Sequence, residues 1–209
     1  ITNNSASLVS DTYFTGFSSS TLQPVIWLLV FAGMVFGVVM LGVEKGIEKC
    51  SKVLMPALVA MALFIALYAL FTPGAIEGVK YYLIPDFSRF SIMTVVAAMG
   101  QMFYSLSIGM GILFTYGSYM KREIDMEQSI TQVEIMDTLI AFLAGLMIIP
   151  AVFAFSGGNP DTLNAGPSLM FITMPKVFAS MSFGNIIGLV FFLLVLFAAL
   201  TSAISLMEC

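Results

Sequence analysis

Long apolar stretches alternate with short polar ones along the whole chain. Five of these stretches have the length of a membrane-spanning helix, and they cover residues 25–43, 53–71, 91–119, 130–155 and 186–207. The first holds 19 consecutive uncharged residues, and a helix of that length extends about 28 Å, enough to cross the hydrocarbon core of a bilayer. The pattern predicts an all-α integral membrane protein with a single transmembrane domain (1–209).

Composition agrees with a membrane protein and excludes several other classes. Apolar residues make up 59% of the 209 residues and charged residues 10%, whereas a soluble domain carries about 25% charge. The net charge of −4 provides no basic face for nucleic acid. The chain has no His, and Cys50 and Cys209 lie far apart, so neither a zinc site nor a disulfide framework is indicated. Without a metal-ligand cluster or a nucleophile–base pair, we expect no enzyme activity.

Basic residues are unevenly distributed among the loops. The loops 44–52 and 121–128 hold five Lys and Arg residues, and the loops on the opposite side hold three. This bias places the loops 44–52 and 121–128 in the cytoplasm. We expect a multi-pass protein of the plasma (inner) membrane. The long loop 156–185 is then external and is expected to act as a lid, with a short surface helix near 168–179. The chain begins without Met and stops directly after an apolar run, which indicates a piece of a longer protein.

Small and polar residues gather in the middle of the third apolar stretch. Ser105, Ser107, Gly109 and Gly111 fall within seven residues. Glycine costs about 1 kcal/mol in a helix interior, and serine can bond its own backbone instead of extending the helix. A membrane span loses helical hydrogen bonds only where the freed groups line a buried or watery cavity. The stretch therefore predicts a discontinuous helix, as found at substrate sites of secondary transporters, although a plain helix that packs through small residues fits this stretch equally well.

A single carboxylate, Asp137, lies inside the fourth apolar stretch. A charge at that depth costs several kcal/mol unless it faces a cation or a water-filled cavity. The alternative is a helix that begins later, with Glu134 and Asp137 in water at its start. The residues from Thr138 to Phe155 would still extend about 27 Å, which is marginally enough to span. Both interpretations stay open, with the cation site favoured.

Two further patterns are weak by themselves. Ala198, Thr201 and Ser202 share one helix face, and a carbonyl with two hydroxyls offers the hard oxygen ligands of an alkali cation. In membrane helices, however, Thr and Ser commonly bond back to the preceding turn. Gly46 and Pro56 lie ten residues apart at the start of the second stretch, where proline makes a helical turn easier to open. Spacing alone favours an ordinary first-turn proline.

Five sequence words carry a family resemblance. They are EKGIEKCSKVLMP (44–56), GQMFYSLSIGMGILFTYGSYMKR (100–122), DTLIAFLAGLMIIP (137–150), GPSLMFITMPKVF (166–178) and ALTSAISLME (199–208). In order and spacing they resemble the neurotransmitter:sodium symporter family, most closely its bacterial amino-acid transporters. The resemblance implies that the five spans are the fourth to eighth helices of a transporter built from two inverted five-helix repeats. The chain would straddle the junction of the repeats, and the family's first and third helices would lie outside it.

The resemblance also implies roles for individual residues. Ser105 and Asp137 would contribute to a first sodium site, and the Ala198 carbonyl with the Thr201 and Ser202 hydroxyls to a second. Family members commonly have Asn where Asp137 stands, and chloride-dependent members add a Ser where this chain has Ala141. Asp137 would then supply a fixed negative charge, and chloride would not be required. The substrate-binding residues would be Tyr104, Ser105, Ser107, Gly109, Met110, Ser202 and Leu206.

The implied activity is sodium-coupled symport of a neutral amino acid by alternating access. Gln101 would belong to the external gate and Tyr119 to the cytoplasmic gate, while Gly46 and Pro56 would mark where the second span opens. Met110 stands where some members have Phe, and the deformable Met side chain favours a hydrophobic or aromatic substrate. The alternative is a sensor, channel or inactive relative with the same fold. The partners implied are the amino acid and the lipid bilayer, with no nucleic acid, and the oligomeric state stays open.

Overall fold

The computed structural model describes residues 11–157, 166–181 and 183–209, and every regular element in these ranges is helical. The α-helices are α2 (Asp11–Ser19), α3 (Gln23–Val39), α4 (Lys49–Leu70), α5 (Ala75–Leu83), α6 (Ile92–Ser105), α7 (Ile112–Tyr119), α8 (Met126–Ser156), α9 (Met174–Ser180) and α10 (Gly184–Glu208). Short π-helical turns form η1 (Val43–Glu48) and η5 (Leu169–Thr173), and 3₁₀ turns form η2 (Phe87–Arg89) and η3 (Ile108–Met110). The predicted all-α class is confirmed.

The apolar stretches form helices of three different kinds. Within the described residues, three helices are long and apolar enough to cross a bilayer without a break: Gly46–Leu70, α8 and α10. Helix α3 has 17 residues and is bent by 80° from α2, so these two form a fourth, bent candidate. The third predicted span is divided into α6 with 14 residues and α7 with 8 residues.

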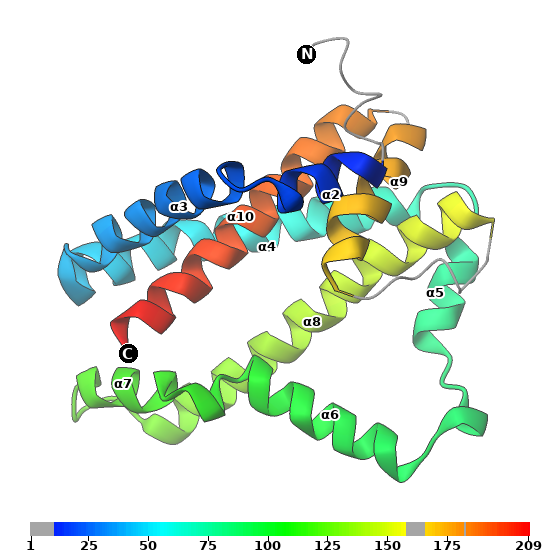
Figure 1. Cartoon of the computed structure of the whole chain (residues 1–209). Helices are drawn as coiled ribbons and strands as arrows, with labels where there is room; N and C mark the ends of the chain where they lie inside the picture. The colour runs from blue at the N-terminus through cyan, green and yellow to red at the C-terminus, as the bar shows by residue number, and fades with distance from the viewer. Residues whose placement is uncertain (1–10, 158–165, 182) are drawn as a thin grey trace.

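Helices α3, α4 and α10 run side by side, α8 crosses them at an angle, and α6 lies apart from them (Figure 1). The main apolar core lies where α4, α8, α9 and α10 meet, at the end of the bundle near α9. Its most deeply buried side chains include Ile65, Val152, Met174 and Phe191, each at most 1% exposed. Helix α6 has no buried residue. The main core contains no residue of α6 or α7, so the break between these two helices lies outside it.

Two segments outside the predicted spans contain packed helices. Helix α5, between the second and third predicted spans, lies against α8 so closely that a Cβ on Gly78 would lie 2.7 Å from the Pro150 Cα. The predicted surface helix near 168–179 appears as η5 and α9, and α9 buries Val177 and Phe178 in the core instead of lying on the surface. Residues 158–165 and 182 of the predicted lid lie outside the described residues. The lid function of loop 156–185 stays a prediction.

Candidate functional site

The break between α6 and α7 has an irregular backbone with two left-handed residues. Helix α6 ends at Ser105, η3 makes a single 3₁₀ turn, and α7 begins at Ile112. Ser107 and Gly111 flank η3 with φ angles of 56° and 77°. A left-handed conformation costs a residue with a Cβ about 1–2 kcal/mol, and such strained residues concentrate at functional sites. The prediction of a discontinuous helix is confirmed, and Ser107 lies at the break.

Asp137 lies well inside α8 and contacts the broken helix. The carboxylate of Asp125 caps α8 by accepting hydrogen bonds from the Glu127 and Gln128 N–H groups at 3.0 and 3.3 Å. Because the helix begins at Met126, Asp137 lies about three turns from its start, and the alternative of a later start is wrong. The Ser105 hydroxyl donates to Asp137 Oδ1 at 2.7 Å. The first pair of predicted sodium-site residues is thus in direct contact, although the two residues are 32 positions apart.

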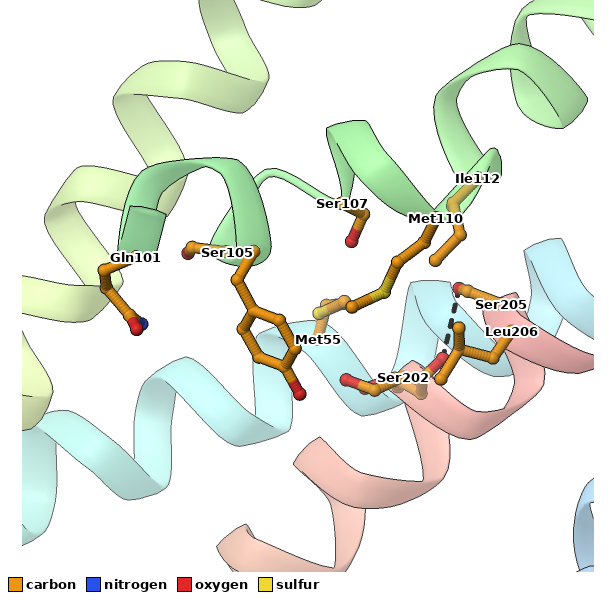
Figure 2. A pocket seen from close by; sticks show the side chains of 11 residues that line it. Met55, Gln101, Ser105, Ser107, Met110, Ile112, Ser202, Ser205 and Leu206 are labelled. Atoms are coloured by element: carbon orange, nitrogen blue, oxygen red, sulfur yellow. Dashed lines mark hydrogen bonds between the residues drawn. The ribbon is translucent and has the colours of Figure 1, made fainter. Parts of the chain in front are cut away.

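A cavity of about 370 Å³ lies between the helix break, α4 and α10. Figure 2 shows Ser107 and Met110 on the side of the break, facing Ser202 and Leu206 on α10. Its lining includes most of the predicted site residues, namely Gln101, Tyr104, Ser105, Ser107, Met110, Thr201, Ser202 and Leu206. The cavity therefore joins the predicted substrate-binding segment to the predicted second sodium site.

The α10 side of the cavity presents oxygen atoms on one helix face. The Thr201 hydroxyl, on a residue only 8% exposed, donates to the carbonyls of Phe197 and Ala198, at 3.0 Å in each case. This is the back-bonding that the sequence left as an alternative to a cation site. It does not exclude the cation, because a hydroxyl that donates its proton keeps lone pairs that can bind a cation. Ser202, the next residue, is exposed and lines the cavity.

The remaining predicted residues are not among those that line the cavity. Gly109 is the middle residue of η3. Gly46 is buried in η1, where a Cβ would collide with the Val38 carbonyl oxygen, so η1 approaches α3 too closely for any side chain. Pro56 lies inside α4, directly after the cavity-lining Met55. The Tyr119 hydroxyl donates to Glu208 Oε1 at 2.9 Å and so joins the end of α7 to the end of α10.

Three cavity residues were not predicted: Met55, Ile112 and Ser205. Ser205 follows Thr201 by four residues and Ser202 by three, so an extension of the helical pattern by one turn would have found it. Met55 and Ile112 are apolar residues in apolar helices, and no sequence signal distinguishes them from their neighbours. Only the packing of three helices brings them to the cavity.

The donor atoms around the cavity suit an alkali cation. Among the described residues there is no group of three or more His, Cys, Asp and Glu side chains that could hold a metal ion. The predicted ligands offer the hydroxyls of Ser105, Thr201 and Ser202, a backbone carbonyl, and the carboxylate of Asp137, which bonds to Ser105 but is not itself part of the cavity lining. These hard ligands fit sodium better than a transition metal.

Comparisons with known proteins agree with this geometry. The model of the sodium:neurotransmitter symporter family matches residues 16–209. The chain belongs to this family. An uncharacterized sodium-dependent transporter of Bacillus subtilis, YhdH, is 38% identical over 195 residues, which cover 93% of this chain and 42% of that protein. The sodium-dependent serotonin transporter of Drosophila melanogaster is 30% identical over 191 residues, covering 87% of this chain and 30% of the transporter.

A solved structure shows the same fold. The crystal structure of MhsT in complex with L-phenylalanine matches with a TM-score of 0.82 and 38% identity, over 98% of this chain and 48% of MhsT. The family resemblance and the partial inverted-repeat transporter fold are thus confirmed. The chain spans less than half the length of these relatives. The relatives from Bacillus subtilis and Drosophila melanogaster are sodium-dependent transporters by name.

Proposed function

We propose that the full-length protein is a sodium-coupled symporter that carries a neutral amino acid across the plasma membrane by alternating access. The observation that carries this proposal is the cavity at the helix break. One side holds Ser105, bonded to Asp137, and the other holds Thr201, bonded to the Ala198 carbonyl. Broken helices at a membrane site expose N–H groups to a carboxylate and carbonyl oxygens to a cation. The cavity thus has the groups to bind an amino acid beside sodium.

Sodium is a co-transported substrate in this proposal, with two groups of ligands. Ser105 and Asp137 contribute to the first site. The Ala198 carbonyl with the hydroxyls of Thr201 and Ser202 contributes to the second. A fixed carboxylate beside the first ion balances its charge, so we propose that transport needs no chloride.

The cavity lining favours a hydrophobic or aromatic side chain on the substrate. Tyr104, Met110 and Leu206 supply apolar surface, and the flexible thioether of Met110 adapts to ligands of different shape. The volume of about 370 Å³ lies at the small end of the range of ligand pockets. MhsT was crystallised with L-phenylalanine, which makes this amino acid the first candidate to test.

The gates lie on either side of this cavity in the proposal. Gln101 lies about one turn before Ser105 on α6 and belongs to the external gate, which the loop 156–185 covers. Tyr119, bonded to Glu208, belongs to the cytoplasmic gate. The π-helical turn at Gly46 and the proline at position 56 mark where the start of α4 opens, so that water reaches the second sodium site.

The test is uptake by the full-length protein in proteoliposomes. A panel of labelled amino acids is offered with an inward sodium gradient and again with potassium in place of sodium. Accumulation of one or a few neutral amino acids only with sodium would support the proposal and name the substrate. Binding without accumulation would instead indicate a sensor or channel-like relative, and accumulation that ignores sodium would overturn the roles given to Asp137, Thr201 and Ser202.

A further inference from the structure

One face of α7 contacts one face of α10. Ile112, Tyr116 and Tyr119 are spaced i, i+4, i+7 and therefore lie on the same side of α7. The Tyr116 hydroxyl donates to Ser205 Oγ at 2.8 Å, and the Tyr119 hydroxyl donates to Glu208. The half-helix that follows the break is thus attached to the helix that carries Thr201.

Tyr116 is anchored at both ends. Its ring packs against a small apolar cluster centred on Val35, Ile47 and Ile204, which joins α3, η1 and α10. Its hydroxyl reaches beyond this cluster to Ser205. A tyrosine held in this way has little freedom, so its hydrogen bond fixes the distance between α7 and α10 at this level.

Ser205 lines the cavity but offers it no proton. Its hydroxyl donates to the Thr201 carbonyl at 3.1 Å, the bond that the dashed line from Ser205 marks in Figure 2, and accepts the hydrogen bond from Tyr116. A serine hydroxyl has a single hydrogen to donate, and this one is used within α10. The arrangement points to a positioning residue rather than to a polar contact with the substrate.

Two consecutive hydrogen bonds connect α7 with Thr201, a residue of the predicted second sodium site. The Tyr116 hydroxyl donates to Ser205, and the Ser205 hydroxyl donates to the Thr201 carbonyl. Two hydrogen bonds that share a hydroxyl polarise one another. The Thr201 hydroxyl donates separately to the Ala198 carbonyl and is connected to this pair through the Thr201 backbone. The turn of α10 that holds the sodium ligands is in this way tied to the inner half of the broken helix.

We propose that the Tyr116–Ser205 hydrogen bond positions the second sodium site and couples it to the helix break. This inference rests on the proposed function, because it assigns a role within the sodium-dependent cycle. An amino acid bound at the break fixes the position of α7. Through the Tyr116–Ser205 bond, the position of α7 in turn fixes the turn of α10 that contains Thr201. Removal of the bond loosens that turn and weakens sodium binding, while the amino acid keeps its own contacts.

The test measures the sodium concentration that gives half-maximal amino-acid uptake by the full-length protein in proteoliposomes. Tyr116→Phe and Ser205→Ala each remove the bond and are expected to raise this concentration about three- to tenfold, the worth of one hydrogen bond. The double variant is expected to show no larger change than Ser205→Ala alone, because both single variants remove the same bond between the two helices. Because coupling between two sites is reciprocal, the KM for the amino acid at saturating sodium is expected to rise by no more than the same factor. Ser205→Thr keeps a hydroxyl and is expected to restore the wild-type sodium dependence.

Two matched variants control for the loss of a hydroxyl alone. Tyr81→Phe, on α5, removes a hydroxyl that has no hydrogen-bond partner in the described part of the chain, while its ring contact with Phe153 remains. Ser129→Ala, on α8, removes a bond to the Asp125 carbonyl four residues earlier, the same local geometry as Ser205 and Thr201 but without a hydrogen bond to a second helix in the described part of the chain. Both variants are expected to reach half-maximal uptake at the same sodium concentration as the wild type.

The possible results separate this inference from the proposed function. Unchanged half-saturation in Tyr116→Phe and Ser205→Ala, or effects that multiply in the double variant, would overturn the coupling role while wild-type symport stands. If Tyr116→Phe does not reach the membrane, Ser205→Ala tests the same bond from its other partner, and Ser205→Thr shows whether the hydroxyl is responsible. A wild-type protein whose uptake ignores sodium would overturn the proposed function and the inference with it.

Discussion

The charge of Asp137 is the feature whose removal tests the first sodium site most directly. Asp137→Asn keeps the size and shape of the side chain, and its amide oxygen can still accept the bond from Ser105, which measures 2.7 Å. The substitution therefore removes one negative charge and little else. A unit charge about 4 Å from sodium is worth about 4 kcal/mol at an effective dielectric constant near 20. Because Asp137 is only half-buried, solvent screening reduces this to about 1–2 kcal/mol.

That loss corresponds to about a five- to thirtyfold rise in the sodium concentration for half-maximal uptake. The assay is sodium-dependent uptake by the full-length protein, with its amount in the proteoliposomes measured for each variant. Glu134→Gln is the matched control, since it removes the same charge from the same helix about one turn earlier, in a separate apolar pocket. An unchanged sodium dependence in Asp137→Asn, or an equal change in Glu134→Gln, would refute the reasoning.

Three other predictions concern the helix break, the pocket wall and the anion. Gly111→Ala places a side chain on a residue with a φ of 77° and open space around it, so backbone strain of about 1–2 kcal/mol should lower the temperature of thermal inactivation. Gly117→Ala, inside α7, should not lower it. A larger loss of thermal stability in Gly117→Ala than in Gly111→Ala would contradict this account. Met110→Phe should crowd the cavity and raise the KM for L-phenylalanine at least about fivefold with alanine little affected, and an equal change for both amino acids would argue against a pocket wall. Replacement of chloride by gluconate at constant sodium should leave uptake unchanged, and abolished uptake would show that Asp137 does not replace chloride.

The broken helix could be predicted from sequence because its cause is local. Serine and glycine between residues 105 and 111 weaken the helix where they stand. The backbone is left-handed at Gly111, where glycine adopts this conformation readily, and at Ser107, where it is strained. The contact between Ser105 and Asp137 is different in kind. It joins two helices, and only the family resemblance indicated it, because no local pattern relates residues that far apart.

The packing of the helices could not be predicted, because apolar residues cover every face of a membrane helix. In α10, Phe191 is fully buried while Leu189 is 62% exposed, although both are large apolar residues in the same stretch. Periodicity carries little information in such a sequence, so the burial of α9 and the contact of α7 with α10 were missed. Ser205 and Tyr116 lie on that contact, and only the assembled helices show that they are bonded.

The central claim is that the cavity at the helix break binds an amino acid together with sodium. Equilibrium binding of labelled L-phenylalanine, or of the substrate that the panel identifies, to the purified full-length protein tests it without the rest of the transport cycle. We predict saturable binding in sodium, little binding in potassium, and a need for more sodium in Asp137→Asn and Thr201→Ala. Binding of equal strength in sodium and potassium would contradict the claim, because the oxygens of Asp137, Thr201 and Ser202 would then have no part in holding the ion.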